Sequence, residues 1–188
     1  DLSTGKAHRL TRHEGRETMP RFSPDGRLLA FSGEYDGVRE VYVMPVEGGI
    51  PRRLTYMEDN AEPLDWSPDG KQILFRARSI PVSWRLFTVP VEGGFPRRLP
   101  IEFASHACFT GPNRIVFTRF QRSDMAWFGY DGGRVNQIWL GDSIFDEPKF
   151  RVFAKERKGS CEYPAFADGA VWYAGDADGQ YRLLRSGN

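Results

Sequence analysis

The fold is decided by the stretch from Phe22 to Leu54, which reads FSPDGRLLAFSGEYDGVREVYVMPVEGGIPRRL. Its opening five residues return 44 residues later as Trp66-Ser67-Pro68-Asp69-Gly70. Its closing ten residues, PVEGGIPRRL, return 45 residues later as PVEGGFPRRL at residues 90–99. Self-similarity with a period of about 40–45 residues, built from short strands and tight turns, is typical of the blades of a β-propeller.

Turn residues divide each repeat into short apolar runs. In the first repeat, Pro24-Asp25-Gly26 predicts a tight turn, because Pro fixes φ and Gly accepts a positive φ. We therefore expect an all-β fold, a β-propeller of four-stranded antiparallel blades. The spacing divides the chain into an outer strand at 1–17, blades at 18–57, 58–101 and 102–158, and a partial blade at 159–188.

The two ends of the chain carry complementary parts of a repeat. Residues 5–11 (GKAHRLT) match residues 49–55 (GIPRRLT), so the chain begins on an outer-strand sequence, whereas it ends after the third strand of its last unit. We predict about four blades, three whole and one split between the termini. The alternative is a propeller fragment whose free blade edges pair between molecules to form a homo-oligomer.

The charge balance, the two cysteines and the first residues of the chain limit the classes of partner and the cellular compartment that we expect. The chain has 26 Lys and Arg against 25 Asp and Glu, which argues against nucleic-acid or membrane partners. Cys108 and Cys161 fall in different repeats, so we expect two buried thiols instead of a disulfide. The first residues lack the apolar stretch of a secretory signal. We expect a cytoplasmic protein, with the periplasm as the alternative, because a removed signal leaves no trace.

The sequence contains no complete motif for catalysis or metal binding. Ser105 and His106 are neighbours in a predicted strand, where successive side chains point to opposite faces, which argues against a catalytic pair. His8 and His13 lack Cys or Glu at ligand spacing, so zinc is not expected. Residues 176–179 (DADG) lack the further ligands of a calcium loop. The sequence therefore predicts no catalytic residue, no metal and no cofactor.

Polar residues of the predicted inner strands are the first candidates for binding. Inner strands line the central channel of a propeller, so these side chains converge there either to bind a ligand or only to be solvated. The candidates are Glu17, Arg21, Glu62, Asp65, His106 and Glu162.

Two further features attract attention. The long connection 119–136 carries Trp127, Phe128 and Tyr130, which we interpret as an interface or as a cap over the blade. Arginines recur at equivalent outer-strand positions, where they form either a positive rim or solvated charges that oppose edge aggregation. They are Arg52, Arg53, Arg97 and Arg98, with His8 and Arg9 at the matching place.

These repeats resemble the WD40-like repeats of TolB and, most closely, the N-terminal six-bladed propeller of tricorn protease. The segment WFGYDGG at residues 127–133, followed by NQIW at 136–139, is similar to a tricorn loop and strand. Ala174-Gly175-Asp176 departs mildly from the Leu-Ser-Asp usual there. The resemblance implies a passage or filter for peptides, with the serine peptidase machinery elsewhere in the protein.

Three functions are therefore weighed. The first is a non-catalytic propeller that binds or guides peptides or protein partners. The second is an inactive fragment of a tricorn-like serine peptidase. The third is a TolB-like interaction scaffold in an envelope complex.

Overall fold

The computed structural model describes residues 3–57, 59–80, 83–120, 135–153, 159–176 and 180–186. Over these ranges the chain forms β-strands and no helix, which confirms the expected all-β class. Consequently, none of the described residues belongs to a helix that could cross a membrane.

The strands form four antiparallel sheets in which each strand pairs with its neighbour in sequence. The first sheet contains β1 (Glu17–Phe22), β2 (Leu28–Asp36), β3 (Val38–Pro45) and β4 (Arg52–Arg53). The second contains β5 (Ala61–Trp66), β6 (Gln72–Ile80), β7 (Ser83–Pro90) and β8 (Arg97–Arg98). The third contains β9 (His106–Gly111), β10 (Arg114–Thr118), β11 (Trp139–Asp142) and β12 (Lys149–Val152). The fourth contains β13 (Cys161–Ala167), β14 (Ala170–Gly175) and β15 (Arg182–Arg185).

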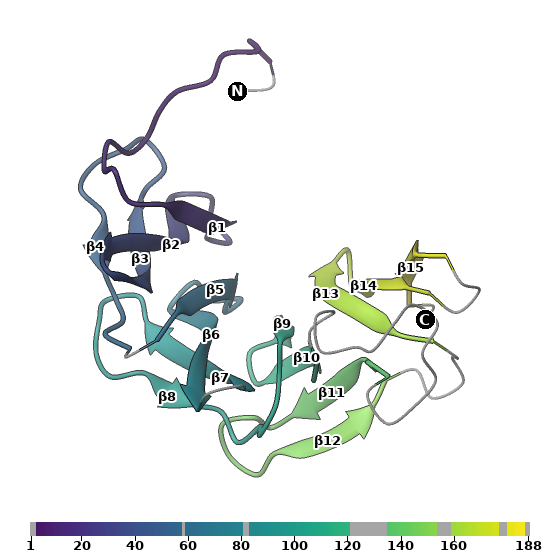
Figure 1. The fold of residues 1–188 in the computed structure, drawn as a ribbon. Coiled ribbons are helices and arrows are strands. Elements are labelled where there is room, and N and C mark those ends of the chain that lie inside the picture. The colour runs from purple at the N-terminus through teal and green to yellow at the C-terminus, as the bar shows by residue number, and fades with distance from the viewer. Residues whose placement is uncertain are drawn as a thin grey trace.

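The four sheets stand side by side around an arc, with the inner strands β1, β5, β9 and β13 toward its centre (Figure 1). This is the arrangement of propeller blades, so we call the sheets the first to fourth blades. The arc is open between the first and fourth blades, and the segment before β1 runs away from the sheets (Figure 1).

The expected sharing of the fourth blade between the two termini is not formed. The fourth sheet has three strands among the described residues, and residues 6–11 are not a strand. A strand forms only where another edge can pair its backbone groups. Here Thr11 is tied to Glu17 at the start of the first blade by a side-chain hydrogen bond, whereas β15 lies across the opening of the arc.

The Ser-Pro-Asp-Gly turns have the same hydrogen bonds in the first two blades. In the first, Ser23 Oγ donates to Asp25 Oδ1 at 2.6 Å and accepts from Leu28 N at 2.9 Å. Both distances recur at the turn that begins with Ser67. Gly26 has a φ of 71°, the left-handed conformation that favours glycine. The repeated motif therefore specifies the turn through its own side chains.

Apolar residues fill the spaces between neighbouring blades, because successive strand residues face opposite sides. Phe75 and Phe87 of the second blade stack at 5.3 Å and pack toward the first blade. Leu74 and Leu86, one position away on the same strands, pack against the third blade. The second and third blades thus depend on their neighbours for the burial of both faces.

Arg52, Arg53 and Arg97 are not simply solvated, which corrects the simpler of the two interpretations for these three arginines. Arg52 donates to the carbonyl oxygen of Val91 in the second blade at 2.5 Å. Arg97, its repeat equivalent, donates to the carbonyl oxygen of Phe145 in the third blade, also at 2.5 Å. The arginine at this position therefore ties the first blade to the second and the second blade to the third.

Candidate functional site

The candidate site is the wall formed by the inner strands of the four blades. Three of the predicted residues, Glu62, His106 and Glu162, occupy equivalent positions in successive inner strands. They lie opposite Arg76, Thr118 and Ala174 on the neighbouring strands, as Thr18 lies opposite Ser32 in the first blade.

Glu62 is the centre of a buried ionic cluster. Arg76 of the same blade donates to its Oε2 from Nε at 2.9 Å and from Nη2 at 2.6 Å. Arg39 of the first blade donates to its Oε1. Arg76 also donates from Nη1 to the carbonyl oxygen of Ser105 in the third blade at 2.7 Å. One cluster thus connects three blades. Because Glu62 is only 5% exposed, its carboxylate oxygens are not accessible to a ligand.

Arg21 and Asp65 tie inner strands together in the same way. Arg21 Nε donates to the carbonyl oxygen of Leu64 at 2.7 Å, and Trp66 Nε1 donates back to the carbonyl oxygen of Arg21 at 2.9 Å. Asp65 Oδ2 accepts from Phe109 N in the third blade at 2.8 Å. Burial raises the pKa of Asp65, although the backbone N–H groups of Phe109 and Trp66 and the nearby Arg21 charge oppose this rise. Both residues remain partly exposed.

His106 meets the fourth blade at the wall. Its ring packs edge-on against Tyr163, with the ring centroids 4.6 Å apart. Burial, with help from the positive charges of Arg76 and Arg21, lowers the pKa of His106 to about 4. The imidazole is therefore neutral at pH 7 and accepts or donates hydrogen bonds without charge.

Ser105 and His106 do not point to opposite faces, which corrects the argument from alternation. Ser105 Oγ lies 3.2 Å from His106 Nδ1, because Ser105 precedes the first residue of β9 and sits in a bend. However, Ser105 Oγ donates to the carbonyl oxygen of Phe120 at 2.5 Å. Its single hydrogen is thus directed away from the histidine, which is not the arrangement of an activated nucleophile.

The remaining predicted residues differ in exposure. Glu17 is exposed and accepts hydrogen bonds from Tyr35 and Thr11, and burial with this Glu17 contact raises the pKa of the Tyr35 hydroxyl. Glu162 is buried and accepts from Tyr181 at 3.1 Å. Trp127, Phe128 and Tyr130 lie outside the described residues.

Exposed aromatic side chains on the inner strands were not anticipated from the sequence. Phe22 on β1 is 67% exposed, and Tyr163 and Phe166 on β13 are 52% and 42% exposed. Trp66, the repeat equivalent of Phe22 and Phe166, is only 3% exposed because it packs against the first blade. Tyr163 has a φ of 53°, in the bulge that interrupts the pairing of β13 with β14.

The described residues hold no group of three or more His, Cys, Asp or Glu side chains that could bind a metal. Cys108 and Cys161 are both buried free thiols. Burial and the charge of Asp65 raise the pKa of the Cys108 thiol, which keeps it protonated.

Comparison with known proteins places this fold in a family. A family model described as the tricorn protease N-terminal beta propeller domain matches residues 1–186. The chain belongs to this family. It is 28% identical over 190 residues to tricorn protease homolog 1 of Streptomyces coelicolor, covering 98% of this chain and 17% of that protein.

Solved structures agree on the fold. The crystal structure of the tricorn protease matches with a TM-score of 0.75 and 21% identity, covering 99% of this chain and 19% of the other. TolB from Acinetobacter baumannii matches with a TM-score of 0.63 and 20% identity, covering 99% of this chain and 47% of the other. The chain thus spans less than a fifth of the tricorn-type proteins that it matches, at the position of their N-terminal propeller.

Proposed function

We propose that this tricorn-type propeller is a non-catalytic binding segment that receives peptides along its inner-strand wall. The observation that carries the proposal is the exposure of Phe22, Tyr163 and Phe166 on the strands that face the centre of the arc. Large apolar side chains that are left exposed near one another mark interaction sites more often than single scattered ones do.

The chemistry of the wall suits an extended peptide. Exposed aromatic rings anchor apolar side chains. Beside them, partly exposed Arg21, Asp65 and neutral His106 offer hydrogen bonds to a peptide backbone. Since the Ser105 hydroxyl is directed to a carbonyl oxygen, the wall binds without cleaving. Cleavage then belongs to another part of a tricorn-like peptidase.

Fluorescence anisotropy with labelled apolar-rich peptides tests the proposal. We expect Tyr163→Ser and Phe166→Ser each to weaken binding about tenfold, the effect of losing one interface anchor. Phe95→Ser is the matched control, because Phe95 is 97% exposed on a turn between outer strands. An equal loss in the control, or no binding by the unmodified chain, would overturn the proposal.

The non-catalytic part of the proposal has its own assay. The isolated chain should release no product from peptide or ester substrates. Turnover that disappears in Ser105→Ala would contradict this expectation directly, because Ser105 is the described serine that lies beside a histidine ring nitrogen.

A further inference from the structure

The first blade contains a buried carboxylate held by its own outer strand. Glu40 Oε1 accepts from Arg53 Nη2 at 2.9 Å and from the Met57 backbone N at 2.6 Å. Glu40 Oε2 accepts from Thr55 Oγ1 at 2.5 Å. This carboxylate therefore has a donor on every side, and Arg53 has its counter-charge.

The second blade reverses the charge at the same place. Arg85 lies opposite Ala77 as Glu40 lies opposite Gly33. Arg98 pairs with Phe87 as Arg53 pairs with Tyr42, so Arg98 is the equivalent of Arg53. The acid–base pair of the first blade thus becomes two cations on one face of the second sheet. The third blade has neutral residues at both positions. Val152 lies opposite Trp139 and so takes the place of Arg98, and Gln137, two residues before Trp139, takes the place of Arg85.

Among the residues that the structure describes, Arg85 is buried without an acidic partner for its charge. It is 9% exposed, and its Nε and Nη1 atoms are buried with no hydrogen-bond partner. Its guanidinium carbon lies 4.9 Å from the centroid of the Phe103 ring. Across the part of the chain that the structure describes, no carboxylate forms an ion pair with Arg85 or Arg98. Stacking on an aromatic ring offsets only part of the cost of burying an unpaired cation.

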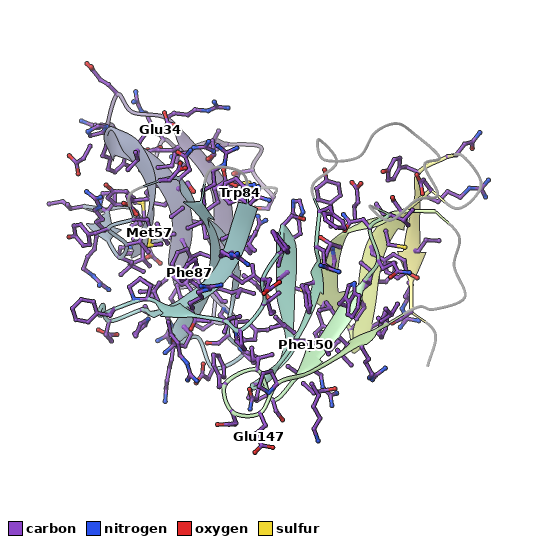
Figure 2. The ribbon with its side chains drawn as sticks, turned by 60° about the horizontal axis from the view of Figure 1, so that its bottom comes forward. Glu34, Met57, Trp84, Phe87, Glu147 and Phe150 are labelled. Atoms are coloured by element: carbon purple, nitrogen blue, oxygen red, sulfur yellow. The ribbon has the colours of Figure 1, made fainter. Side chains whose placement is uncertain are left out.

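We propose that Arg85 and Arg98 form a binding site for the carboxylate of an acidic side chain on a partner peptide. The first blade shows the same backbone holding a carboxylate beside its outer-strand arginine. Guanidinium groups bind planar carboxylates through paired donors, which fits an acid bridging the two arginines. Trp84 and Phe87 mark this part of β7 in Figure 2. The site lies toward the outer strand, so its test is separate from that of the inner wall.

The probe is a short peptide, acetylated and amidated at its ends, with one Glu between glycines. Its twin carries Gln in place of Glu. We expect the Glu peptide to raise the melting temperature of the chain and the Gln twin to leave it unchanged. Arg85→Met should abolish the response. Arg27→Met should retain it, since Arg27 is a solvated arginine of the first blade with a side chain 84% exposed.

A second variant keeps the proposal testable if Arg85→Met folds poorly. Arg85→Glu rebuilds the acid–base pair of the first blade with Arg98, so it should raise the melting temperature without peptide and remove the peptide response. Arg98→Ala in the Arg85→Glu background should cancel the gain.

Three results would overturn the proposal. The first is equal binding of the Glu and Gln peptides. The second is a response to inorganic phosphate but none to the Glu peptide. The third is that Glu58→Gln lowers the melting temperature and that this variant, unlike the unmodified chain, is then stabilised by the Glu peptide. Such a result would mean that an acidic residue of this chain already fills the site. Glu58 lies outside the described residues.

Discussion

Replacing Glu62 by Gln removes the one carboxylate shared by Arg39 and Arg76. The side chain of Arg76 is 9% exposed, so its charge would be left buried and unpaired, at a cost of about 3 kcal/mol. The side chain of Arg39 is 28% exposed and keeps a second acid, Glu34, at 3.3 Å, so its loss adds only about 1 kcal/mol. We therefore expect Glu62→Gln to destabilise the fold by about 4 kcal/mol.

Urea unfolding followed by tryptophan fluorescence measures this change. With a slope of about 2 kcal/mol per molar urea, the midpoint should fall by about 2 M. The matched control is Arg27→Ala, which breaks an exposed pair with Asp25 at 3.9 Å and should leave the urea midpoint nearly unchanged. A loss in Glu62→Gln no larger than the loss in the control would refute the reasoning.

A double variant tests whether the orphaned charge is the cause. Glu62→Met with Arg76→Leu removes the acid and its buried partner together, leaving no unpaired buried ion at that place. Apolar replacement of a buried pair is often neutral or stabilising. The double variant should therefore be more stable than Glu62→Gln alone. If the two losses simply add, the cluster is not coupled.

Three further predictions follow from the inner wall and the rim. The folded-state pKa of His106, about 4, lies below the ordinary value of 6.5, so the unfolded chain binds more protons than the folded chain between these two pH values. The melting temperature should therefore fall as the pH drops from 6.5 to 4, and it should fall less in the variant His106→Phe. Cys108 should react with a thiol reagent at pH 8 only after denaturation, because burial raises its pKa; fast labelling of the folded chain would contradict its burial. Arg97→Ala should cost about 1 kcal/mol in urea unfolding through its lost bond to the next blade, whereas Arg98→Ala should cost less, because Arg98 is equally exposed and makes no such bond to another described residue.

Local chemistry made the blades predictable from the sequence. The turn at Ser23 is fixed by hydrogen bonds within five residues, so its motif carries the whole explanation. The apolar runs between the turns likewise indicated strands, and Phe75 of one such run lies in the core. Such features depend on residues that are close in sequence. The second copy of the motif in the chain supported the same turn and strand assignments as the first.

The roles of the wall residues depend on contacts that the sequence does not display. Glu62 was expected to line the channel, yet its partners come from two other strands in two blades. Ser105 and His106 approach one another because β9 begins between them, and strand boundaries are the least certain part of any sequence-based assignment. Residues 6–11 have an outer-strand sequence but no adjacent edge in this structure. A sequence motif indicates which kind of strand a segment can form. Whether the strand forms depends on whether the arrangement of the blades brings a free sheet edge next to that segment.

The bonds that join neighbouring blades end largely on the main chain. Arg21 reaches the carbonyl of Leu64, Trp66 that of Arg21, and Arg76 that of Ser105. A carbonyl oxygen is present whatever side chain a residue carries. A duplicated blade can therefore keep these particular bonds whatever side chain its neighbour carries at the accepting residue. Propellers joined in this way can gain or lose a blade in one genetic event, and their blades are free to diverge in sequence afterwards.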